Sequence, residues 1–178
     1  MRPAIGLYTD TLTDLEGNVI SVTSGRNQPQ DDQTLITARL FSGTSIGMPL
    51  SYLAVGSGEP NWDITAPVLD PTDTSLLNET FRVPIASSSI LFVDPVSEVE
   101  SPTPTRAIRI TVQLGLDITG DLREMALYGG DASSVLGSGL MFNWIVTPLL
   151  NKTSSQLLTR RIVLKWLTDE EATSAYCN

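Results

Sequence analysis

Ala107-Ile-Arg-Ile-Thr-Val-Gln-Leu-Gly-Leu116 is the stretch of this sequence that decides the fold. Apolar residues stand at every second position, and polar residues fill most of the positions between them. Strict alternation is typical of a β-strand, because successive side chains of a strand point to opposite faces of the sheet. One face is therefore expected to be buried and the other to be wet, as in an antiparallel sheet. The residues expected on the buried face are Ile108, Ile110, Val112, Leu114 and Leu116.

A second alternating stretch places Phe81, Val83 and Ile85 on one face of a strand. The residues on the opposite face are Thr80, Arg82 and Pro84. Since proline has no backbone N–H to donate to a neighbouring strand, this strand is expected to run along an edge of the sheet or to end there.

The last predicted strand runs from about Gln156 to Leu167, and its pattern is mixed. Its apolar face is formed by Leu158, Ile162, Leu164 and Trp166. Arg160 interrupts that face, and Val163 interrupts the polar one. Two explanations remain open. Either a neighbouring subunit covers part of the strand, or the core of the domain is simply wide.

One α-helix is predicted near residues 30–42. Asp31 and Asp32 stand in its first turn, where acidic side chains favour a helix, and Gly43 is placed to end it. Apolar residues with helical spacing are expected to face the sheet, and they are Leu35, Ile36 and Leu40.

The sequence as a whole predicts a mainly β, antiparallel β-sandwich-like domain with that single helix and long projecting loops. An N-terminal hairpin, at about residues 4–24, is expected to turn through Glu16-Gly17-Asn18. Two segments rich in Pro, Asp, Thr and Ser, Glu59–Asp73 and Asp94–Thr105, are interpreted as projecting loops that carry partner contacts. All 178 residues are assigned to one domain, with a short C-terminal tail at about 168–178.

The composition excludes several classes of function. Eleven basic against twenty acidic residues give a net charge of −9, which repels nucleic acids and anionic membranes. Apolar runs are strand-sized and far below the ~20 residues that cross a bilayer. Residues 1–10 lack the pattern of a secretory signal, so synthesis and assembly in a cytoplasm are expected. Cys177 is the single cysteine, which rules out an intrachain disulfide.

Enzymatic motifs are weak. Gly43-Thr-Ser-Ile-Gly47 matches the G-x-S-x-G pattern of hydrolases, but the chain has no histidine to activate Ser45. Acidic residues are numerous, and a carbohydrate-cleaving site would need two carboxylates opposed across a cleft, which spacing alone does not reveal. The turn Asp14–Asn18 has calcium-binding chemistry without the spacing of an EF-hand. We expect no catalytic residue, no metal ligand and no cofactor.

The aromatic residues suggest either a sugar-binding platform or a core, and the core is favoured because they are scattered. They are Trp62, Trp144, Trp166, Tyr128 and Phe142. Trp62 is the exception, since it lies in the long loop between Pro60 and Pro67. We interpret Trp62, with Pro60 and Pro67, as a partner contact, and a Trp62 that folds back onto its own domain as the alternative.

Three motifs occur in order: Ala54-Val-Gly-Ser-Gly58, Leu76-Leu-Asn-Glu-Thr-Phe-Arg82 and Arg123-Glu-Met-Ala-Leu-Tyr128. Together with the stretches Gly139–Pro148 and Leu157–Trp166, they resemble small structural proteins of tailed bacteriophages and related contractile particles. That family includes the N-terminal attachment domains of tail-collar fibres. The resemblance implies that Glu79, Arg82, Arg123 and Glu124 form a structural charge network that pins the crossing segment to the sheet.

The resemblance also implies a function. It is that of a non-enzymatic virion component of the tail, in the baseplate, collar or neck, that connects fibres or neighbouring tail proteins. Its expected partners are copies of itself, in a ring or trimer, and other tail or fibre proteins. Fibres of this family continue for hundreds of residues past the domain, whereas this sequence stops at Asn178, which favours a small free-standing component. The alternatives are a capsid decoration protein and a carbohydrate-binding or carbohydrate-cleaving tail component.

Overall fold

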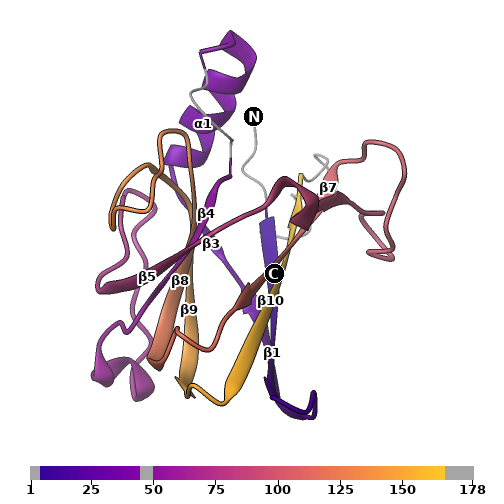
Figure 1. Cartoon of the computed structure of the whole chain (residues 1–178). Helices are drawn as coiled ribbons and strands as arrows, with labels where there is room; N and C mark the ends of the chain where they lie inside the picture. The colour runs from indigo at the N-terminus through magenta and orange to yellow at the C-terminus, as the bar shows by residue number, and fades with distance from the viewer. Residues whose placement is uncertain (1–4, 45–49, 167–178) are drawn as a thin grey trace.

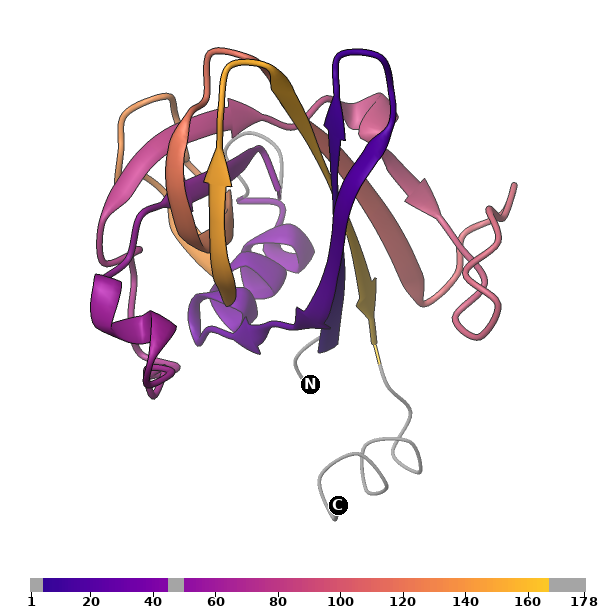
Figure 2. The same ribbon diagram turned by 90° about the horizontal axis from the view of Figure 1, so that it is seen from below.

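The computed structural model describes residues 5–44 and 50–166, which form two antiparallel sheets packed face to face (Figures 1 and 2). Sheet A has the strand order β2 (Val19–Arg26), β1 (Ile5–Asp14), β10 (Gln156–Lys165), β7 (Ala107–Leu114) and β6 (Ile90–Phe92). Sheet B has the order β3 (Gln28–Pro29), β9 (Leu140–Lys152), β8 (Gly120–Gly129), β4 (Tyr52–Gly56) and β5 (Glu79–Pro84). The predicted β-sandwich-like fold is confirmed.

The alternating stretch becomes β7, an inner strand of sheet A. Ile110, Val112 and Leu114 are buried between the sheets, as the alternation predicts. Leu116 was expected on the same face, and that expectation is wrong. The strand ends at Leu114, and Leu116 lies in the following turn with 40% of its surface exposed.

β10 owes its mixed pattern to residues of this chain. Leu158, Ile162 and Leu164 are fully buried, and Arg160 on the same face is fully buried as well. The Arg160 guanidinium forms an ion pair with Asp10 on the neighbouring strand β1. Val163, on the outer face of sheet A, packs in a small apolar cluster with two residues from outside β10, Val93 and Ala107. The core therefore explains the apolar face of β10, and the outer cluster explains Val163.

β5 forms the edge of sheet B that Pro84 predicted.

The predicted helix is α1 (Asp32–Ser42), and Gly43 ends it with a φ of 67°, in the left-handed region that favours glycine. Its expected apolar face is partly wrong, because only Ile36 of the three predicted residues is buried. The helix stands at one end of the sandwich, against β9, instead of lying across a sheet face (Figure 1), so Leu35 and Leu40 remain exposed.

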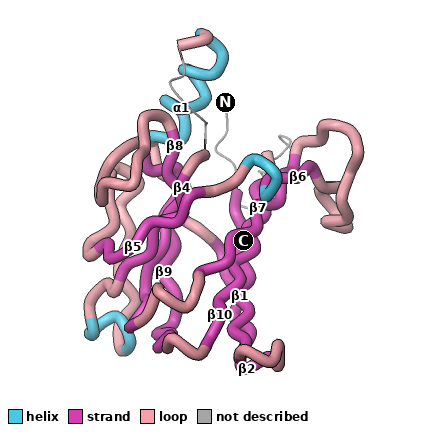
Figure 3. Tube along the Cα trace, viewed as in Figure 1, coloured by secondary structure: helices cyan, strands magenta, loops and turns pink. Residues whose placement is uncertain are grey.

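The two long loops contact different sheets. The segment 57–78 contains one short 3-10 helix near its start, η1 (Pro60–Asp63), and lies over the outer face of sheet B (Figure 3). The loop after β6 turns back at Glu98, whose carboxylate pairs with Arg161 and Lys165 of β10. A short 3-10 turn, η2 (Ser87–Ser89), precedes β6. Within residues 5–44 and 50–166, no helix has the length and apolar character to span a bilayer.

Candidate functional site

A β-bulge in β8 is what brings the predicted charged residues onto the outer face of sheet B. Leu122 and Met125 both belong to the core between the sheets, although an uninterrupted strand would place them on opposite faces. The pairing of β8 with β9 shifts register between Leu122 and Glu124. Because of that shift, Arg123 and Glu124 both contact the segment 57–78 that covers the outer face.

Glu124 holds this segment by its backbone. Its side chain is fully buried, and its carboxylate accepts hydrogen bonds from the backbone N–H groups of Asn78 (2.7 Å), Leu77 (3.0 Å) and Gly58 (3.3 Å). Burial raises the pKa of Glu124, and these backbone hydrogen bonds oppose the shift. A buried acid with three backbone donors is a structural anchor that ties both ends of the covering segment to β8.

Arg123 fixes the same segment at η1. Its guanidinium makes two hydrogen bonds of 2.9 Å to the carboxylate of Asp63, and a third contact of 3.4 Å reaches Asp121. The hydrogen bonds from Arg123 hold the pKa of Asp63 below its usual value. Such a two-pronged pair fixes geometry, because the planar guanidinium matches a carboxylate in only a few orientations.

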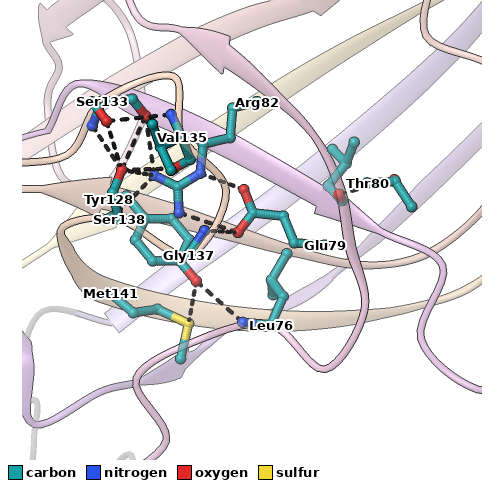
Figure 4. A network of polar contacts seen from close by, with 11 residues as sticks. Leu76, Glu79, Thr80, Arg82, Tyr128, Ser133, Val135, Gly137, Ser138 and Met141 are labelled. Carbon is teal, nitrogen blue, oxygen red and sulfur yellow. Dashed lines mark hydrogen bonds and ion pairs between the residues drawn. The ribbon is translucent and has the colours of Figure 1, made fainter.

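Arg82 and Glu79 form a second anchor, shown in Figure 4. The two side chains are 1% and 6% exposed, and the Arg82 guanidinium donates two hydrogen bonds to the Glu79 carboxylate. Arg82 also donates to the carbonyl oxygen of Ser138 at 2.7 Å, and Glu79 accepts from the N–H of Gly137 at 2.9 Å. The pair thereby ties the loop that precedes β9 to the edge strand β5.

Tyr128 joins the two anchors. Its ring lies 4.1 Å from the Arg82 guanidinium carbon, and its hydroxyl oxygen accepts a hydrogen bond of 3.1 Å from the N–H of Leu76 (Figure 4). Burial raises the pKa of Tyr128 to about 12. We call Glu79, Arg82, Arg123, Glu124 and Tyr128 the clamp.

The residues of the predicted charge network thus form two separate groups of ion pairs, one around Arg82 and one around Arg123. Arg82 pairs with Glu79, Arg123 pairs with Asp63 and Asp121, and Glu124 binds backbone N–H groups. Tyr128 and residues 76–79 connect them. Asp63 was missing from the prediction because it lies sixty positions before Arg123 in an irregular loop, where no periodic signal marks a partner.

The predicted partner contact lies on the segment that the clamp holds. Trp62 is half-buried and packs against Trp144 of its own domain, with the ring centroids 6.3 Å apart. A side chain at Gly58 would overlap the Trp62 ring, which explains the glycine there. Pro60 is exposed and Pro67 is partly exposed. Trp62 therefore folds back onto its own domain, as in the alternative interpretation. The most exposed apolar residues of the segment are Ile64 and Val68, which are 90% and 99% exposed.

The described residues contain no group of three or more acidic or cysteine side chains placed to hold a metal ion. In the turn after β1, the Asp14 carboxylate accepts hydrogen bonds from the backbone of Glu16 and Asn18 and from the Asn18 side chain. The turn is thus organised by its own donors. Ser45 and Gly47 of the G-x-S-x-G pattern lie outside the described residues.

One functional side chain was missed by the sequence reasoning altogether. Lys152 is 1% exposed, and its ammonium group donates to the carbonyl oxygens of Gly115 (2.6 Å) and Ile118 (2.8 Å). Burial lowers the pKa of Lys152. It fixes the turn between β7 and β8, and no neighbouring residue in the sequence signals this role.

The described residues form an antiparallel β-sandwich of two sheets. Residues 57–78, which we call the arm, cover the outer face of sheet B and are held there by the clamp. Comparisons of the chain with protein-family models, with curated proteins and with solved structures give no significant match.

Proposed function

We propose that this chain is a non-enzymatic structural protein of a bacteriophage tail, which binds other subunits through its arm. The observation that carries the proposal is that the three motifs of the resemblance meet at one place. Gly58 of the first motif and Asn78 of the second both donate backbone hydrogen bonds to Glu124 of the third. Arg82 of the second stacks on Tyr128 of the third. The motifs therefore share one physical task, which is to hold the arm on sheet B.

The use of the buried charges also supports a structural role. Glu124 and Lys152 bind backbone groups, and Arg82 and Arg160 are each paired with a carboxylate. An acid or base that acts on a substrate must reach it within hydrogen-bonding distance, and these groups are occupied by the fold itself. Among the residues that the arm exposes are the apolar Ile64 and Val68, which suit a protein partner.

In this proposal the partners are copies of the chain, in a ring or trimer, and other tail or fibre proteins at the baseplate, collar or neck. A specific contact of this kind buries roughly 1,000 Å² or more. Assembly takes place in the host cytoplasm, and the finished protein resides in the virion.

The test is to locate the protein in the particle. Particles that incorporate a tagged copy are imaged by electron microscopy, and label at the tail is expected. Label spread over the head would instead assign the chain as a capsid decoration protein, and unlabelled particles would contradict any virion role. Turnover of a bacterial surface polysaccharide by the purified protein would favour the carbohydrate-cleaving alternative.

A further inference from the structure

One of the sheet edges lacks the features that normally keep edges apart. A free strand edge presents unpaired N–H and C=O groups, and proteins guard such edges with proline, charge or very short strands. β6 and β3 have three and two residues, β5 carries Pro84, and the part of β9 that β3 leaves uncovered carries Pro148. β2 has eight residues, no proline and a single charge, Arg26, at its end, and its one irregularity is a β-bulge at Ile20, where its pairing with β1 shifts register.

Among residues 5–44 and 50–166 no strand pairs with the outer edge of β2, and the backbone groups on that edge can be assigned. The N–H of Asn27 donates to the carbonyl oxygen of Gly6 on the β1 side, at 3.1 Å. Hydrogen-bonded pairs alternate along an antiparallel ladder, so the N–H and C=O groups of Val22, Ser24 and Arg26 point away from β1. Exposed apolar side chains lie on β2 and in the turn before it, and they are Leu15, Val19, Ile20 and Val22.

We propose that β2 pairs edge to edge with β2 of a second copy of this chain, antiparallel about a two-fold axis at Val22. In that register Val22 lies opposite its own symmetry mate, and Arg26 lies opposite Asn18 of the other copy, beside Glu16. Arg26 is exposed, and Glu16 is exposed in the turn at the other end of the hairpin. The charges at the two ends of β2 are therefore complementary only when the strands run antiparallel, which favours an identical partner.

This pairing would join two copies of sheet A into one continuous sheet. It uses the opposite sheet from the arm, so it goes beyond the proposed tail function and does not depend on it. A ring or trimer would have to use another surface, because a two-fold contact closes on itself in a dimer.

The test uses the purified full chain alone. Sedimentation velocity over a concentration series is expected to show a reversible dimer for the wild type. Val22→Lys places a charge on each side of the axis and is expected to raise the dimer dissociation constant by at least about tenfold. The matched control is Thr111→Lys, an exposed position on the same outer face but on the inner strand β7, which is expected to dimerise as the wild type does.

A cross-link tests the register. In a Cys177→Ser background, which removes the single native cysteine, Val22→Cys is expected to form a disulfide-linked dimer on mild oxidation. Hydrogen-bonded partners lie about 5.5 Å apart at Cα, within the range that a disulfide spans. Thr111→Cys in the same background is expected to run as a monomer in non-reducing gel electrophoresis. A wild type that is monomeric throughout the series, a Val22→Lys variant that dimerises normally, or a Val22→Cys variant that does not cross-link would each overturn the proposal.

Discussion

At the scale of single residues, this protein uses buried charge to hold backbone in place. The Glu124 carboxylate replaces the water that three N–H groups would otherwise bind, and Lys152 does the same for two carbonyl oxygens. A buried donor or acceptor without a partner costs free energy, so irregular segments next to a core need such side chains. The resemblance implied a structural role for Glu124 and Arg82, but an irregular loop gives no periodic signal for the groups that they bind.

The first prediction concerns the clamp. Glu124→Ala leaves three buried N–H groups without an acceptor, and Arg82→Ala leaves the Glu79 carboxylate buried without its partner. Each variant is expected to lower the free energy of unfolding by about 3 kcal/mol. Urea denaturation measures the loss, and Glu100→Ala, at a largely exposed ion pair, is the control that should remain close to wild type. Wild-type unfolding midpoints in both clamp variants would show that the clamp has no structural role.

The second prediction concerns the alkaline stability set by Tyr128. Its folded pKa of about 12 lies above the ordinary value of 10.0, so the folded state keeps the phenol proton that the unfolded chain loses. The stabilising contribution is therefore complete below pH 10.0 and decreases as the pH rises toward about 12. Thermal denaturation across this range should show a steeper loss in the wild type than in Tyr128→Phe. Equal slopes in the wild type and in Tyr128→Phe would contradict the assignment.

At the scale of elements, alternation predicted β7, Pro84 predicted the edge position of β5, and helical spacing with the terminal residues predicted α1, because each of these signals is local. The bulge in β8 could not be predicted, because it depends on the register of β8 against β9. The exposed face of α1 was missed for a related reason: helical spacing shows which residues share a face, not whether the helix lies across a sheet or at its end. The position of the arm is likewise a matter of long-range contacts.

The third prediction separates the two uses of the arm. Trp62→Ala removes a half-buried ring from its contact with Trp144 and is expected to cost about 2 kcal/mol of stability while assembly persists. Ile64→Ser combined with Val68→Ser changes only exposed side chains, so stability should be unchanged while incorporation into particles is lost. Incorporation is measured by quantifying the tagged protein in purified particles. Normal incorporation of the double variant would show that these exposed residues of the arm do not contact a partner.

At the scale of the whole molecule, the sandwich is closed by strands from opposite ends of the described chain. β1 pairs along its full length with β10, and the two strands supply one face of the core through Tyr8, Leu12, Leu158 and Ile162. The sequence predicted a strand near each end, one in the N-terminal hairpin and one over the mixed stretch from about Gln156. It could not predict that they are neighbours, because residues 150 positions apart carry no shared local signal.

The last prediction concerns the buried pair at this closure. Arg160 is fully buried, pairs with Asp10, which is 2% exposed, and lies with its guanidinium carbon 4.7 Å from the centre of the Tyr8 ring. Asp10→Ala leaves an uncompensated charge in the core and is expected to cost about 3–5 kcal/mol of stability. Asp10→Leu combined with Arg160→Met replaces both charges by apolar groups, and it should recover most of that loss, because one Arg160 nitrogen has no hydrogen-bond partner even in the wild type. Chemical denaturation of the two variants measures the difference. A double variant less stable than Asp10→Ala would show that the pair itself stabilises the closure, beyond merely satisfying its own buried charges.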